Sequence, residues 1–217
     1  MIVAIDGPAG AGKSTIAKII AQKLGFLYID TGAMYRALTL KVLREKVDIK
    51  DIGRIIKITA EFSIDLINNP DGSLKVLLNG EDVSRQIREP VITKFVSDVA
   101  KIKEVRQIML KMQRSFGKRG DCVLDGRDIG TVVFPDAEKK FYLDAHFKER
   151  VKRRHRELDE LGQEITFGDV ERDLHNRDTI DSTREVAPLK KADDAIYVDT
   201  TDMTIDEVVN AVLKEIR

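Results

Sequence analysis

The stretch that decides the fold of this chain is residues 1–14, MIVAIDGPAGAGKS. Residues 1–5 form an apolar run typical of a buried strand, and a helix-forming segment follows Ser14. Between them, residues 7–14 fit the pattern GxxxxGK[ST] of a phosphate-binding loop, which needs a strand before it and a helix after it. A glycine-rich turn without a ligand is the alternative, and the flanking segments disfavour it. The sequence therefore predicts a nucleoside triphosphate site.

The residue types of this loop suit a polyphosphate. Glycines let backbone N–H groups curl around phosphate oxygens, and the positive end of the following helix dipole faces the same oxygens. Lys13 adds a positive charge that reaches the β- and γ-phosphates, and the Ser14 hydroxyl can ligate Mg²⁺. We expect the loop residues to bind the nucleotide, namely Gly7, Pro8, Ala9, Gly10, Ala11, Gly12, Lys13, Ser14 and Thr15.

Length and composition limit the class of protein. A chain of 217 residues suffices for one core with an inserted lobe and is short for two full domains. The 37 basic residues balance 37 acidic ones, so no global positive field favours nucleic acid. No apolar stretch is long enough for a membrane span, and the first strand starts at Met1 without a signal peptide. The single cysteine, Cys122, lies in an apolar run; we interpret it as a buried hydrophobe rather than a catalytic thiol, in a reducing cytoplasm.

Strands alternate with helices along most of the chain. Short apolar runs predict strands at residues 26–29, 122–125, 140–144 and 195–199, and several of them end in an acidic residue. Helical patterns cover residues 13–24, 32–44, 51–60, 90–116 and 205–216. This order predicts an α/β protein with a parallel sheet flanked by helices and a ligand site at the carboxyl ends of the strands.

One segment departs from this order. From about residue 61 to 85 the apolar residues alternate with polar ones, and the runs are separated by Asn, Asp and Gly turn signals. The pattern predicts a small antiparallel β insertion. Such an insertion can be a substrate-binding lobe or a passive surface decoration, and its own residues do not decide between the two.

Two charged clusters follow predicted strands, which places them near the phosphate loop. Residues 30–36, DTGAMYR, carry Arg36 in the first turns of a helix, where it can fork onto a phosphate or face solvent. Residues 125–130, DGRDIG, put three charges in four residues at a strand end. An acid such as Asp125 at this position commonly holds Mg²⁺ directly or through water, and Arg127 and Asp128 project into the same crevice.

Two further groups of charged residues are ambiguous. Arginines recur between residues 150 and 156, but nearby acidic residues also fit a solvated helix face. Arg177, Asp181 and Arg184 share one helix face if the helix persists. They could form an ion-pair ladder or a clamp for an anion and a hydroxyl.

Together these clusters resemble the bacterial cytidylate kinases of the nucleoside monophosphate kinase family, which are P-loop enzymes. The resemblance covers essentially the whole chain and rests on four motifs: GPAGAGKST at residues 7–15, DTGAMYR at 30–36, DGRDIGTVVFP at 125–135 and REVAPL at 184–189. It implies one unit of residues 1–217. The core would be residues 1–60 and 90–217, with a monophosphate-binding lobe at about 61–89 and a short helical lid at about 150–165.

The resemblance also implies roles for individual residues. Lys13, Arg127 and Arg177 would be catalytic, Ser14 and Asp125 would hold Mg²⁺, and Arg150 and Arg154 would contact ATP from the lid. The monophosphate site would be lined by residues from all the clusters, namely Thr31, Tyr35, Arg36, Ser97, Arg106, Arg127, Asp128, Arg177, Asp181 and Arg184. Among these, Ser97, Arg106 and Asp128 would read the cytosine edge.

The expected activity is transfer of the γ-phosphoryl group of ATP to CMP and dCMP, giving ADP and CDP or dCDP, with Mg²⁺ in a closed, water-excluding site. We expect a cytoplasmic monomer. Two alternatives remain: another small-molecule P-loop kinase, such as one for UMP, and a P-loop regulatory ATPase. The first differs in the base edge that it must recognise, because uracil presents a carbonyl where cytosine presents an amino group. The second would hydrolyse ATP without a monophosphate.

Overall fold

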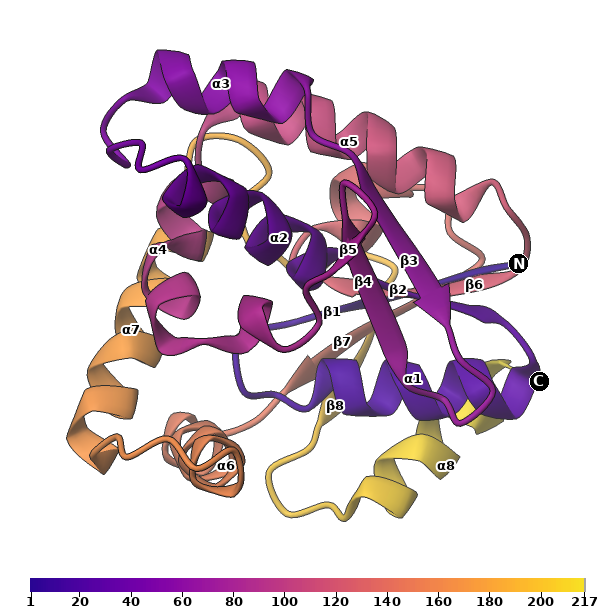
Figure 1. The fold of residues 1–217 in the computed structure, drawn as a ribbon. Coiled ribbons are helices and arrows are strands. Elements are labelled where there is room, and N and C mark those ends of the chain that lie inside the picture. The colour runs from indigo at the N-terminus through magenta and orange to yellow at the C-terminus, as the bar shows by residue number, and fades with distance from the viewer. Residues whose placement is uncertain (217) are drawn as a thin grey trace.

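The computed structural model describes residues 1–216 and is built on a five-stranded parallel sheet (Figure 1). The strand order is β2-β6-β1-β7-β8, so β1 is central and β2 and β8 are the edges. The strands are β1 (Ile2–Asp6), β2 (Leu27–Asp30), β6 (Cys122–Gly126), β7 (Lys139–Asp144) and β8 (Ile196–Asp199). The predicted α/β class and parallel sheet are therefore confirmed.

Helices cover both faces of this sheet (Figure 1). α1 (Lys13–Leu24) and α8 (Ile205–Ile216) pack on one face, while α2 (Thr31–Arg44), α4 (Pro90–Ala100) and α5 (Lys103–Gly117) lie on the other, with α3 (Ile52–Ala60) against α2 and α5. The sequence explains two boundaries: Gly25 ends α1 with φ 70°, and the Asp30 carboxylate caps α2 by accepting a bond from the Ala33 N–H.

The central strand shows why the sheet is buried on both faces. Ala4 belongs to the core between the sheet and α2, whereas Val3 and Ile5 belong to the core under α1 and α8. Alternating side chains point to opposite faces of a strand, so an uninterrupted apolar run is what a sheet with two covered faces requires. The ends of the strands are therefore the part of the sheet that is left to polar residues.

The predicted β insertion is present as a separate antiparallel sheet. It contains β3 (Ile64–Asn68), β4 (Leu74–Leu78) and β5 (Glu81–Asp82), and the short helix η1 (Gln86–Arg88) leads back to α4. Leu66, Val76 and Leu78 are buried in the same core cluster as α2. The insertion is thus packed on the core through its apolar face.

One helix boundary differs from the expectation. The predicted helix at residues 90–116 is two helices, α4 and α5, because Ile102 adopts an extended conformation with φ −67° and ψ 122°. The Ile102 side chain is buried in the core. This tertiary packing outweighs the preference of the segment for one continuous helix. The break redirects α5, and Arg106 lies in its first turns.

Two more helices complete the molecule at the end of the sheet where the phosphate loop lies. α6 (Phe147–Glu160) and α7 (Phe167–Thr183) pack on each other and enclose Ala9 of that loop in a small apolar cluster with Val151 and Leu174. Within residues 1–216, no helix combines the length and the apolar composition that a membrane crossing would require.

Candidate active site

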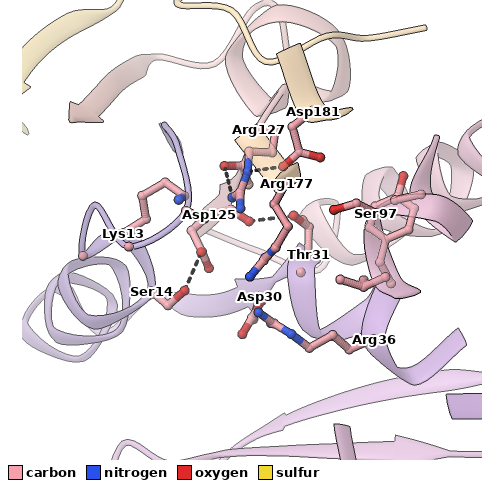
Figure 2. A pocket seen from close by; sticks show the side chains of 18 of the residues that line it. Lys13, Ser14, Asp30, Thr31, Arg36, Ser97, Asp125, Arg127, Arg177 and Asp181 are labelled. Atoms are coloured by element: carbon pink, nitrogen blue, oxygen red, sulfur yellow. Dashed lines mark hydrogen bonds and ion pairs between the residues drawn. The ribbon is translucent and has the colours of Figure 1, made fainter. Parts of the chain in front are cut away.

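A cavity of about 430 Å³ opens at the carboxyl ends of the parallel strands. It is lined by the phosphate loop, the start of α2, α4, the loop after β6 and α7, from which Figure 2 labels residues, and also by η1 and α6. The elements of the predicted motifs therefore meet in one place, as expected of the switch region of a doubly wound sheet. Three kinds of surface can be distinguished within the cavity.

The first surface is the phosphate loop, which is held tightly from behind. A Cβ atom on Gly7 would lie 1.9 Å from the carbonyl oxygen of Leu143, so a side chain at this position would collide with β7. Lys13 is buried, and its Nζ donates to the Pro8 carbonyl oxygen at 2.7 Å. Burial, together with the positive charge of Arg127, lowers the pKa of Lys13 well below its usual value. An anion bound next to Lys13 would stabilise its charged form and raise the pKa again.

Arg150 and Asp178 brace the outer side of the same loop. Arg150 Nη1 donates to the Ala9 carbonyl oxygen at 2.8 Å and to Asp178 Oδ2 at 2.5 Å, and Asp178 Oδ1 accepts from the Ala9 N–H at 3.2 Å. Arg150 thus contacts the loop on the side that faces away from the cavity, and it does not line the cavity. Arg154, one turn later in α6, lines the cavity and pairs with Glu157 at 2.8 Å.

The second surface presents oxygen atoms that suit a cation. Ser14 Oγ donates to Asp125 Oδ2 at 2.8 Å, and the Tyr28 hydroxyl donates to Asp125 Oδ1 at 2.9 Å. Burial and the nearby charge of Asp30 raise the pKa of Asp125 to about 6. A buried carboxylate beside a hydroxyl, at the mouth of a phosphate loop, fits the oxygen preference of Mg²⁺. The positive charge of such an ion would also favour the ionised form of Asp125.

The third surface is a cluster of arginines. Arg36 and Arg177 approach each other beside Asp30 (Figure 2), and Arg88 and Arg127 also line the cavity. Burial and the charge of Arg36 lower the pKa of Arg177 to about 10. Arg177 Nε is buried and has no hydrogen-bond partner within residues 1–216. Neighbouring guanidinium groups of like charge, with a buried donor left unpaired, are typical of a site that binds an anion.

Arg127 is instead held by a carboxylate. Its Nε donates to Asp181 Oδ2 at 2.9 Å, and Arg184 Nη1 lies 3.4 Å from Asp181 Oδ1. Although burial acts in the opposite direction, these arginines keep the pKa of Asp181 below its usual value. α7 ends at Thr183, so of the three residues expected on one helix face only Arg177 and Asp181 belong to the helix. Arg184 lies just beyond the helix and still contacts Asp181.

Asp128 belongs to the same buried ion network, which Arg184 extends from Asp181 to Asp128. Arg106 Nη2 donates to Asp128 Oδ2 at 2.5 Å, and Arg184 Nη2 lies 3.4 Å from Asp128 Oδ1. The Arg106 guanidinium lies 5.6 Å from the centre of the Tyr35 ring, and its Nε lacks a partner within the described chain. Ser97 of α4 is buried and lines the same cavity.

Thr31 connects the start of α2 to the end of β6. Its hydroxyl donates to the Asp125 carbonyl oxygen at 2.6 Å, and the residue lines the cavity next to Arg36. The two predicted charged clusters, residues 30–36 and 125–130, are therefore joined directly by a buried hydrogen bond.

Sequence reasoning missed several residues of this site. Asp6, the last residue of β1, is buried and accepts bonds from the Ile129 and Gly130 N–H groups, each at 2.8 Å, which fixes the backbone directly after Asp128. An acid immediately before the phosphate loop is a usable signal for Asp6, because strand ends face the ligand edge. Three more residues carry no such local pattern. Tyr28 contacts Asp125 and lines the cavity, Asp178 contacts Ala9, and Arg88 lines the cavity.

Comparisons with known proteins show the family of the chain. The cytidylate kinase family model matches residues 3–217. The chain is 51% identical to the cytidylate kinase of Caldanaerobacter subterraneus subsp. tengcongensis over 99% of this chain and 94% of that protein. It is 49% identical to the cytidylate kinase of Clostridioides difficile over 100% of this chain and 98% of that protein.

A solved structure of an uncharacterised protein from Eubacterium ventriosum shares the fold. Its TM-score is 0.52 at 13% identity, over 100% of this chain and 97% of that one. This similarity concerns the fold alone, whereas the sequence matches concern the family. The chain belongs to the cytidylate kinase family and is therefore an ATP-dependent nucleoside monophosphate kinase that phosphorylates CMP.

Proposed function

We propose that the cavity holds ATP at the phosphate loop and CMP at the arginine cluster, and that its residues divide the work of phosphoryl transfer between these two sites. The observation that carries this proposal is the cluster of Arg36, Arg127 and Arg177 in the same cavity as the phosphate loop. Arg177 is buried, and Arg36 and Arg127 are half-buried. Three guanidinium groups withdrawn from solvent in this way suit a phosphate that is separate from those held by the loop.

The donor side consists of residues 7–15, with Lys13 directed to the β- and γ-phosphates. Lys13 Nζ donates to a backbone carbonyl, and exchange of that partner for a phosphate oxygen requires only a side-chain movement. Ser14 and Asp125 would hold Mg²⁺, which supplies positive charge to the phosphate oxygens when bound. Arg154 lines the cavity from the lid helix and would contact ATP, whereas Arg150 supports the loop through Ala9.

The acceptor side consists of the arginines and the residues around Asp128. Arg36, Arg127 and Arg177 would bind the CMP phosphate, because guanidinium groups match phosphate oxygens in geometry and charge. The remaining residues would contact the nucleoside: Asp181 and Arg184 the ribose, Ser97, Arg106 and Asp128 the cytosine edge, and Thr31 and Tyr35 the rest of the wall.

Positioning and electrostatics account for the reaction on these residues. The transition state is loose, with charge spread over the moving phosphoryl oxygens, and the CMP phosphate is already a nucleophile. Lys13, Arg127 and Arg177 stabilise that charge. No general base is needed, because an ionised phosphate attacks without losing a proton. Closure of the lobe at about residues 61–89 and of the lid at about 150–165 would exclude water, which otherwise competes as acceptor.

We extend the proposal to dCMP as a second acceptor, to a monomer as the active unit and to the cytoplasm as its location. The groups assigned above line one cavity within a single chain, so the site needs no residue from a second copy. The free, buried Cys122 is consistent with a reducing compartment.

A coupled assay of ADP release with CMP, dCMP and UMP in turn tests the proposal. CMP and dCMP should stimulate ATP turnover strongly and UMP weakly. Turnover that does not respond to any monophosphate would favour a P-loop ATPase, and a preference for UMP would favour the other kinase.

A further inference from the structure

Asn68 ties the β insertion to the edge of the core sheet. Its Oδ1 accepts a hydrogen bond from the Tyr28 N–H at 3.1 Å, and its Nδ2 donates to the Tyr28 carbonyl oxygen at 3.1 Å. Because β2 is an edge strand of the described sheet, these backbone groups face away from the neighbouring strand β6. The Asn68 amide therefore satisfies both backbone groups of Tyr28, as a neighbouring strand would.

The side chain of Tyr28 reaches from this strand to the carboxylate of the cation site. Its hydroxyl donates to Asp125 Oδ1 at 2.9 Å, while Ser14 donates to the other oxygen at 2.8 Å. Tyr28 is 4% exposed, and burial raises its pKa well above the usual value, so the hydroxyl remains a donor. Both oxygens of Asp125 are thereby oriented, one of them by Tyr28.

We propose that Tyr28 is a positioning residue for the divalent cation, and that Asn68 makes its position depend on docking of the insertion. The inference rests on the proposed function in one respect, namely that Ser14 and Asp125 hold Mg²⁺. Without the Tyr28 hydroxyl, Asp125 can turn away from the direction in which it faces the phosphate loop. The acceptor lobe and the cation site are then coupled through two side chains.

Tyr28→Phe removes only the hydroxyl, and ADP binding measured by calorimetry in Mg²⁺ and in EDTA reports its effect. We define the Mg²⁺ factor as the dissociation constant of ADP in EDTA divided by that in Mg²⁺. In Tyr28→Phe this factor should fall about 10-fold, as expected for a lost hydrogen bond to a charged group. ADP affinity in EDTA should fall by a much smaller factor, because Tyr28 acts on the phosphate loop only indirectly, through Asp125 and Ser14. A wild-type Mg²⁺ factor would overturn the role of Tyr28.

Asn68→Ala tests the link to the insertion, and Asn69→Ala is its matched control. Asn69 Nδ2 donates to Ser73 Oγ at 2.9 Å, within the turn of the same lobe. Asn68→Ala should lower the Mg²⁺ factor and Asn69→Ala should not. In the Tyr28→Phe background, Asn68→Ala should have no further effect. Additive losses, or equal losses in the two Asn variants, would overturn the coupling.

Asp125→Asn separates failure of this inference from failure of the proposed function. If the cation does not bind at Asp125, this variant keeps the wild-type Mg²⁺ factor, and both the cation site and the inference are wrong. If Asp125→Asn abolishes the factor while Tyr28→Phe leaves it unchanged, only the positioning role is wrong. Melting curves of each variant establish that the protein compared is folded.

Discussion

Arg106 Nη2 lies 2.5 Å from Asp128 Oδ2, and both side chains are almost fully buried. The pair comes from α5 and from the loop after β6, so the residues proposed to bind the base are held by contacts between distant parts of the chain. A carboxylate oxygen can accept more than one hydrogen bond, so Asp128 can hold Arg106 and still accept from a cytosine amino group.

Asp128→Asn should therefore reduce the preference for CMP over UMP. The variant keeps the side-chain volume but replaces one acceptor oxygen with a donor, which suits the uracil carbonyl better than the cytosine amino group. We expect the ratio of kcat/KM values for CMP and UMP to fall about 10-fold or more. The KM for ATP should change little. An unchanged ratio in a folded variant would show that Asp128 only pairs with the arginines.

Lys13→Met should lower kcat by several orders of magnitude while the fold survives. The methionine keeps most of the buried stem and removes the charge that we propose acts on the transferred group. Since burial already lowers the pKa of Lys13, its loss should not destabilise the substrate-free protein. Rapid-quench measurement of the chemical step, with a melting curve as control, checks both parts. Near-normal turnover would remove Lys13 from the mechanism.

Asp125→Asn should stabilise the substrate-free protein at pH 8 while it impairs catalysis. Asp125 has a folded-state pKa of about 6 against an ordinary value of 3.8, so the folded state binds more protons between these values. The free energy of unfolding thus falls as pH rises through this window. Above it, the folded state bears the full free-energy cost of the buried, ionised Asp125. The neutral amide avoids this cost, and each kcal/mol recovered should raise Tm by about 2–4 °C.

The same reasoning fixes the control for that experiment. Tm of wild type and Asp125→Asn should converge toward pH 4, where the wild-type carboxyl is protonated in the folded state. Asp6, whose pKa burial raises to about 7, contributes a pH dependence of the same sign in both proteins, so only the difference between them is diagnostic. A difference that does not depend on pH would contradict the assignment to Asp125.

The sequence predicts those parts of the site whose residues are close together in the chain. The strand, loop and helix around Lys13 are recognisable because each has a local pattern, and Gly25 and Asp30 end and begin helices as their residue types favour. The split between α4 and α5 is not predicted, because burial of Ile102 in the core overrides a continuous helical pattern.

Residues that act across the fold could not be predicted in this way. Asn68 and Tyr28 are 40 positions apart, and neither belongs to a motif. Arg150 resembles the other arginines of α6 in sequence, yet its contact with Ala9, 141 positions away, places it against the phosphate loop. Such pairings follow from the packing of complete elements, which local periodicity does not specify.

Hydrogen exchange tests whether the insertion and the proposed lid, at about residues 150–165, close over the substrates. Arg150 is tied to Ala9 and Asp178, so the start of α6 should be protected whether or not ligand is bound. The loop at residues 161–166, beyond the end of α6, should gain protection with a bisubstrate analogue. Within the insertion, the turn at residues 69–73 should gain protection more than Asn68, which is already docked on β2. Equal exchange with and without the analogue throughout both segments would indicate a rigid enzyme that excludes water without closing.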